Sequence, residues 1–166
     1  ELGDTKNAIE MLRQVTSKNP NPRTLSALAS FYERTRDFAS ATEAWRQALQ
    51  MDPENSRIKR ALADDMLRNE RFDDALKLYG EIAAADPRDA QIQLRLSEIY
   101  RQKGDFAKAR AAFNKAHEID PDSLEVRYEE VNLLESEGKN DEAIATLRKM
   151  LSETVKKTYT ESEKGS

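Results

Sequence analysis

Alanine recurs along this chain at an interval of 33 or 34 residues. The five alanines are Ala8, Ala41, Ala75, Ala109 and Ala143. A leucine or an aromatic residue follows each of them at the fourth position, and these residues are Leu12, Trp45, Tyr79, Phe113 and Leu147. We call the residues at the same place in successive periods a column. Several columns with one period indicate a repeated supersecondary unit, which buries a continuous core only by stacking on its neighbours.

Prolines mark the boundaries between the units. They occur in register at Pro20, Pro53, Pro87 and Pro121. Proline lacks a backbone amide donor and disfavours helical geometry at the preceding residue, so each one is expected to end a hairpin. Shortly after three of them stands a residue suited to cap the N-terminus of the next helix, and these are Asn55, Asp89 and Ser123.

Each unit is predicted to contain two helices. Residues 90–102 place Leu96 and Ile99 at helical spacing, and residues 106–119 do the same with Phe113 and Ala116. Gly104 lies between these helices, in one column with Gly3 and Gly138, and suits a left-handed helix C-terminus. Arg36 and Glu70 occupy the same column in two other units. Those two turns are therefore either strained or not left-handed.

The period, the small and aromatic columns of the second helix, the Gly-Asp-Phe turn and the Asp-Pro boundary resemble the tetratricopeptide repeat. The resemblance covers about residues 1–157 and implies an all-α fold, a right-handed superhelical solenoid of antiparallel helix hairpins. The expected organisation is the second half of a truncated repeat at 1–21, repeats at 22–55, 56–89 and 90–123, an atypical repeat at 124–157, and a polar tail or the start of a capping helix at 158–166. The last repeat departs from the pattern at Glu130, where the others have leucine, and at Val155, where they have proline. The chain is interpreted as an excerpt of a longer repeat protein.

Composition excludes several classes of function. The net charge of −4 gives no general attraction to nucleic acid, and no apolar run approaches the ~20 residues of a membrane span. With no cysteine and a single histidine, His117, we expect no metal site, no cofactor and no catalysis. The compartment stays open: a soluble protein of the cytoplasm, or of the periplasm if a signal segment has been removed.

The resemblance implies that first helices line a concave groove, so their residues outside the predicted core are candidates for ligand binding. These candidates are Arg34, Arg57, Arg60, Asp64, Leu67, Arg68, Leu94, Arg95, Arg101, Tyr128 and Asn132. Arginine suits bidentate binding of carboxylates. Two interpretations remain open. Either the arginines hold an acidic segment of a partner while the apolar candidates bind its apolar side chains, or they are solvated charges paired with neighbouring Asp and Glu.

The leading function is therefore a protein-interaction scaffold that binds a peptide segment or a partner helix in the groove. The alternative is a structural spacer that self-associates by end-to-end stacking of its unfinished terminal hairpins. RNA binding is a third interpretation, and the acidic groove residues of the last unit argue against it.

Overall fold

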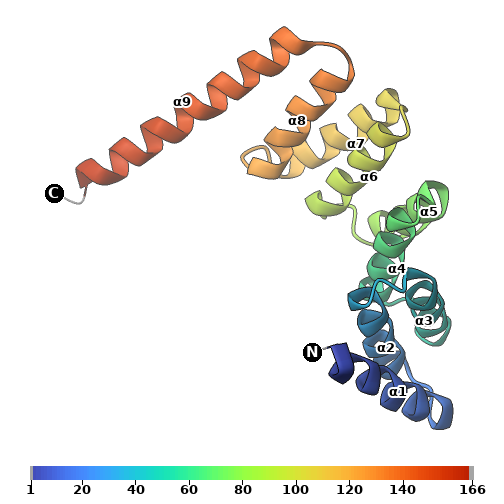
Figure 1. Cartoon of the computed structure of the whole chain (residues 1–166). Coiled ribbons are helices and arrows are strands. Elements are labelled where there is room, and N and C mark those ends of the chain that lie inside the picture. Colours follow the sequence, from blue (N-terminus) through green and yellow to red (C-terminus); the bar gives the residue numbers. More distant parts are fainter. Residues whose placement is uncertain (1, 165–166) are drawn as a thin grey trace. The chain divides into compact units, whose positions relative to one another are not determined.

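The computed structural model describes the backbone of residues 2–164 and the side chains of residues 5–153. Within that range the chain forms nine α-helices and no strand, an all-α helical repeat fold. The chain divides into two compact units, Glu1–Ala85 and Asp86–Ser166. In Figure 1 successive helices of a hairpin run antiparallel.

The first unit contains five helices. Helix α1 (Leu2–Lys18) packs on α2 (Pro22–Arg34), which forms a hairpin with α3 (Phe38–Met51). Helix α4 (Ser56–Arg68) packs on α3 and forms the next hairpin with α5 (Phe72–Ala85).

The second unit contains two hairpins. Helix α6 (Ala90–Gln102) pairs with α7 (Phe106–Ile119), and α8 (Leu124–Ser136) pairs with α9 (Asn140–Lys164). Helix α8 contacts both α6 and α7, so the second hairpin stacks on the first. First helices begin 34 residues apart throughout the chain, and so do second helices from α3 onward.

Side-chain caps fix the starts of most helices. The carboxamide or carboxylate oxygens of Asn55 and Asp89 accept hydrogen bonds from the amides of Ile58 and Ile92, and Ser123 caps α8. The three predicted caps are confirmed. Asp37 and Asp105 cap α3 and α7 in the same way, although the sequence analysis had not singled them out.

The turns inside the hairpins are left-handed, including the two that lack glycine. Gly104 and Gly138 have φ of 76° and 77°, while Arg36 and Glu70 have φ of 61° and 57°. The open question about these two turns is thereby answered: both are left-handed and carry the steric cost of a Cβ.

The repeated columns form the core. The alanine and aromatic columns of α3, α5 and α7 are buried. Trp45, Tyr79 and Phe113 are therefore packing residues. In the second unit, Phe113 packs in one cluster with Val126 and Leu133 of α8.

The last helix differs from the expected organisation. Residues 140–164 form one continuous helix, and no helix end separates the last repeat from the predicted tail at residue 157. Val155 stands where the earlier repeats have the proline that ends the second helix, so the backbone continues in helical geometry. Figure 1 shows α9 as an unbroken helix longer than its partner α8. Residues 165–166 lie outside the described range.

Candidate functional site

An ion pair joins the two first helices of the second unit. Nε and Nη2 of Arg101 on α6 donate hydrogen bonds to Oε1 and Oε2 of Glu129 on α8, at 3.2 and 3.3 Å. The hydroxyl of Ser97 donates to the same carboxylate at 2.8 Å. Glu129 is 3% exposed. A buried carboxylate needs such donors, because an unpaired buried charge is costly.

A similar ion pair joins the first helices α2 and α4 of the first unit. Nη1 of Arg68 lies 3.2 Å from Oε1 of Glu33, which also accepts a hydrogen bond from Trp45 Nε1 at 3.2 Å. The same nitrogen of Arg68 lies 3.9 Å from the buried carboxylate of Asp65. For Arg68 and Arg101 the structure therefore agrees with the second interpretation, in which the arginines pair with neighbouring Asp and Glu.

Two further candidate arginines have partners on their own helix. Nη1 of Arg95 lies 2.9 Å from Oε2 of Glu98, one turn further along α6. The guanidinium of Arg34 lies over the ring of Phe31, 5.2 Å from its centroid. Both arginines are exposed, so these contacts are weak and a ligand can compete for them.

Arg57 and Arg60 lie together at the start of α4. Both side chains are exposed, and with Ser56 they line a cavity of about 280 Å³. The spacing of three residues places the two guanidinium groups on one side of the helix. The structure therefore brings two of the predicted arginines to one small site.

Leu94 requires a correction. It was predicted to face the groove, yet it is 4% exposed and packs in the core cluster with Val126 and Leu133 of α8. Helix α8 of the next hairpin packs on Leu94 and buries it. Tyr128 occupies the same column in the last hairpin and is 51% exposed.

The remaining candidates are partly engaged within the fold. Asp64 accepts a hydrogen bond from the hydroxyl of Tyr79 at 2.5 Å, and Asn132 lies 3.5 Å from the carboxylate of Glu129. Leu67 is half-buried.

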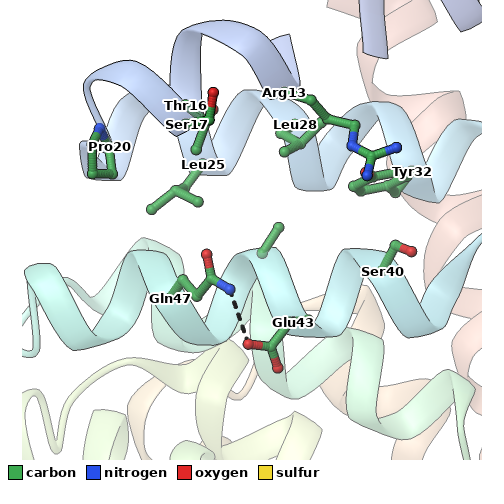
Figure 2. A pocket seen from close by; sticks show the side chains of 11 residues that line it. Arg13, Thr16, Ser17, Pro20, Leu25, Leu28, Tyr32, Ser40, Glu43 and Gln47 are labelled. Atoms are coloured by element: carbon green, nitrogen blue, oxygen red, sulfur yellow. Dashed lines mark hydrogen bonds between the residues drawn. The ribbon is translucent and has the colours of Figure 1, made fainter. Parts of the chain in front are cut away.

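The first unit also contains a crevice that was not predicted from the sequence. It lies between α1 and α3, with the side chains of Leu25 and Leu28 from α2 at its base, and has a volume of about 370 Å³ (Figure 2). Arg13 and Glu43 lie on opposite walls in Figure 2. Gln47 donates a hydrogen bond to Glu43 at 3.0 Å, which lowers the pKa of that carboxyl. The sequence carries one signal of this crevice. Leu25 is apolar, whereas the charged Lys59 stands at the same place in the next repeat.

Among the described residues no group of three or more His, Asp or Glu side chains is placed to hold a metal ion. No described helix combines the length and apolar character needed to cross a membrane.

Comparisons with known proteins agree with the repeat pattern. Family models of the tetratricopeptide repeat match residues 1–22, 22–65, 60–123 and 100–159. No curated protein matches the chain.

Solved structures show the same fold. The crystal structure of MamA is 23% identical with a TM-score of 0.78, over 95% of this chain and 92% of that one. A tetratricopeptide repeat protein from Parabacteroides merdae is 22% identical with a TM-score of 0.84, over 92% of this chain and 61% of that longer one. A MamA structure from Desulfovibrio magneticus is 18% identical with a TM-score of 0.78, over 90% and 85% of the two chains. At these identities the likeness shows the fold alone.

Proposed function

The chain belongs to the tetratricopeptide repeat family, whose members are generally non-catalytic protein-interaction scaffolds, and we propose that it binds an extended acidic segment of a partner protein at the start of α4. The observation that supports this proposal most directly is the cavity lined by Ser56, Arg57 and Arg60.

The local backbone favours an anion at this place. Ser56 and Arg57 belong to the first turn of α4, where backbone amides have no acceptor within the helix. The cap residue Asn55 accepts its side-chain hydrogen bond from the amide of Ile58, three residues further on. The first turn of α4 contains no acidic residue. The partial positive charge of the helix N-terminus therefore adds to the charges of Arg57 and Arg60.

Two other arginines on first helices are less accessible to a ligand than Arg57 and Arg60. Arg68 and Arg101 hold successive first helices together through Glu33 and Glu129, so a ligand would have to displace an internal carboxylate. Arg57 and Arg60 are exposed and line a cavity together with Ser56. An acidic side chain or a C-terminal carboxylate of a peptide is the group that two such guanidinium groups bind best.

A titration with labelled peptides tests the proposal. One peptide is extended and rich in Glu, and the other has the same sequence with Gln in place of Glu. Fluorescence anisotropy with the wild-type protein is expected to show tighter binding of the Glu peptide, with an affinity that falls as salt rises. The variant Arg57→Glu/Arg60→Glu should lose that preference.

A matched variant controls for net charge. Lys115 on α7 and Arg148 on α9 are exposed residues of second helices, so Lys115→Glu/Arg148→Glu makes the same change in total charge at a different place. The account requires this variant to keep the preference for the Glu peptide. Equal losses in the two variants would indicate nonspecific attraction and would rule out a site at α4.

Self-association is a second candidate, and α1 favours it. Met11 is 68% exposed, whereas Ala44, Leu78 and Ala112 in the same column are buried. Sedimentation velocity over a range of concentrations is expected to show a dimer that Met11→Glu/Val15→Glu dissociates. A wild-type protein that stays monomeric at high concentration would exclude this role.

A further inference from the structure

The crevice between α1 and α3 recurs one repeat later. A cavity of about 350 Å³ lies between α3 and α5, with Lys59 and Leu62 of α4 in its lining. These two residues stand 34 residues after Leu25 and Leu28 of the crevice. A complete hairpin, α2 and α3, precedes the second cavity, and no residue of α2 lines that cavity. Two successive second helices and the first helix between them therefore form such a crevice, and a helix before α1 is not expected to close it.

The two cavities have similar volumes and different linings. In the second cavity, Nζ of Lys59 lies 3.2 Å from Oε2 of Glu81, so the base carries an ion pair. In the crevice the same two places hold Leu25 and Gln47. The base of the crevice is therefore apolar, and a hydrocarbon group can lie there without displacing an ion pair of the fold.

One end of the crevice holds polar groups that have no partner in the fold. Arg13, Tyr32 and Ser40 line the crevice, and in Figure 2 Arg13 and Tyr32 lie at the same end, with Ser40 on the facing helix α3. Within residues 5–153, the guanidinium of Arg13 and the hydroxyls of Tyr32 and Ser40 form no ion pair and no hydrogen bond. A guanidinium and two hydroxyls are donors suited to a carboxylate.

The acid on the α3 wall already has partners of its own. Oε1 of Glu43 accepts a hydrogen bond from Gln47 at 3.0 Å, and Oε2 lies 2.9 Å from Nη1 of Arg46. In Figure 2 the carboxylate of Glu43 points toward Gln47 and away from Ser40. The charge that is available to a ligand in the crevice is therefore the positive charge of Arg13.

We propose that the crevice between α1 and α3 binds a small molecule with an apolar body and one carboxylate. The body lies on Leu25 and Leu28, and the carboxylate accepts hydrogen bonds from Arg13, Tyr32 and Ser40. The volume of about 370 Å³ is typical of small-molecule sites, and so is an apolar lining with a few polar groups. This site is separate from the cavity at Arg57 and Arg60 and does not depend on the function proposed for that cavity.

Two matched probes, hydrocinnamate and its neutral amide hydrocinnamamide, test the proposal. They share one apolar body and differ in charge. A titration of the labelled full chain, followed by nuclear magnetic resonance, is expected to show the largest shifts at Leu25 and Leu28 and at least about fivefold tighter binding of the acid. Arg13→Met should remove the preference for the acid. Arg148→Met makes the same change of charge in the same column on α9 and should keep the preference.

A variant that fills the crevice locates the binding. Thr16 lines the crevice, and the second cavity has Leu49 in the same column. The hydroxyl of Thr16 has no hydrogen-bond partner among the described residues, so Thr16→Leu breaks no hydrogen bond and adds a larger side chain. This variant should weaken the binding of both probes about fivefold or more. Unchanged affinities would show that the probes bind elsewhere and would overturn the proposal.

Other outcomes would also overturn it. Equal affinity for the two probes, or a preference that Arg13→Met does not alter, would remove the role of Arg13. Arg57→Glu/Arg60→Glu should leave both affinities unchanged. A loss of the acid preference in that variant would place the carboxylate at the start of α4 and would overturn this proposal alone.

A peptide distinguishes the two sources of a carboxylate beside an apolar group. Acetyl-Gly-Gly-Gly-Phe with a free C-terminus offers the chemistry of hydrocinnamate at the end of a protein chain. We expect it to bind more weakly than hydrocinnamate does. Tighter binding of the peptide would assign the crevice to the C-terminus of a partner protein and would overturn the proposal of a small molecule.

Discussion

Arg101 on α6 donates two hydrogen bonds to the buried carboxylate of Glu129 on α8, and so an arginine expected to bind a ligand instead joins two neighbouring hairpins. The ion pair of Arg68 with Glu33 likewise joins two neighbouring hairpins in the first unit. These ion pairs reduce the number of arginines on first helices that are available for recognition. They also mean that two hairpins stack well only when the charges on their first helices match.

Removing the charge of Glu129 should destabilise the fold. In Glu129→Gln we expect the free energy of unfolding to fall by about 2 kcal/mol, because Ser97 and Arg101 lose a charged acceptor in a buried place. Urea denaturation measures this change. Arg101→Ala should add little in the Glu129→Gln background, whereas additive losses would mean that the two side chains are not coupled. The exposed Arg95 is the control, and Arg95→Ala should cost under about 0.5 kcal/mol.

Leu94 and Tyr128 share a column, so truncation of each measures the effect of stacking. Leu94→Ala should lower the free energy of unfolding by about 2–4 kcal/mol, since it leaves a cavity in the core between α6 and α8. Tyr128→Ala should change it by under about 0.5 kcal/mol, because no described side chain covers the ring fully. Thermal and urea unfolding of both variants provide the comparison. Similar losses at the two positions would contradict the stacking account.

A glycine at position 70 should stabilise the chain. Glu70 has a left-handed backbone with φ of 57°, which costs about 1–2 kcal/mol for a residue with a Cβ. Glycine removes that cost but adds entropy to the unfolded chain, so Glu70→Gly should gain about 0.5–1 kcal/mol. Gly104→Ala, at φ of 76° in the same column, should lose a similar amount. Calorimetric midpoints that move in the opposite directions would contradict the left-handed geometry.

Glu137 should make stability depend on pH in the acid range. The guanidinium of Arg110, together with Lys139, lowers the pKa of Glu137 below its ordinary value of 4.5. A carboxyl with a lowered pKa in the folded state stabilises the fold above about pH 4.5, and that contribution is lost as the pH falls through the lowered pKa. Glu137→Gln should therefore cost about 1 kcal/mol at pH 7, and the cost should shrink toward pH 3. A cost that is constant from pH 7 to pH 3 would show that the charge of Glu137 does not contribute.

The sequence predicted the fold well, because the repeat fixes local and tertiary structure together. The proline and alanine columns located every hairpin, and the caps at Asn55, Asp89 and Ser123 followed from simple helix chemistry. The arginines were harder to assign. Periodicity places Arg101 on a face of α6, but whether that face meets Glu129 or a ligand depends on side chains 28 residues away.

Leu94 was wrongly assigned for a related reason. A first helix packs against its own second helix on one side and against the next hairpin on another. A prediction that assigns a single buried stripe to each helix accounts only for the first of these contacts. Leu94 lies on the second side, so the period alone did not separate it from an exposed residue. Leu94 and Tyr128 stand in the same column, yet among the described residues a hairpin is stacked only on Leu94. Comparing these two residues therefore distinguishes the two environments.

The most direct test of the account is a map of where an acidic peptide binds. Backbone amide chemical shifts of the labelled protein, followed by nuclear magnetic resonance as an extended Glu-rich peptide is added, report the site residue by residue. The account predicts the largest changes at Ser56–Arg60, with smaller changes elsewhere on first helices. Large changes confined to second helices or to the last hairpin, α8 and α9, with none at residues 56–60, would contradict it.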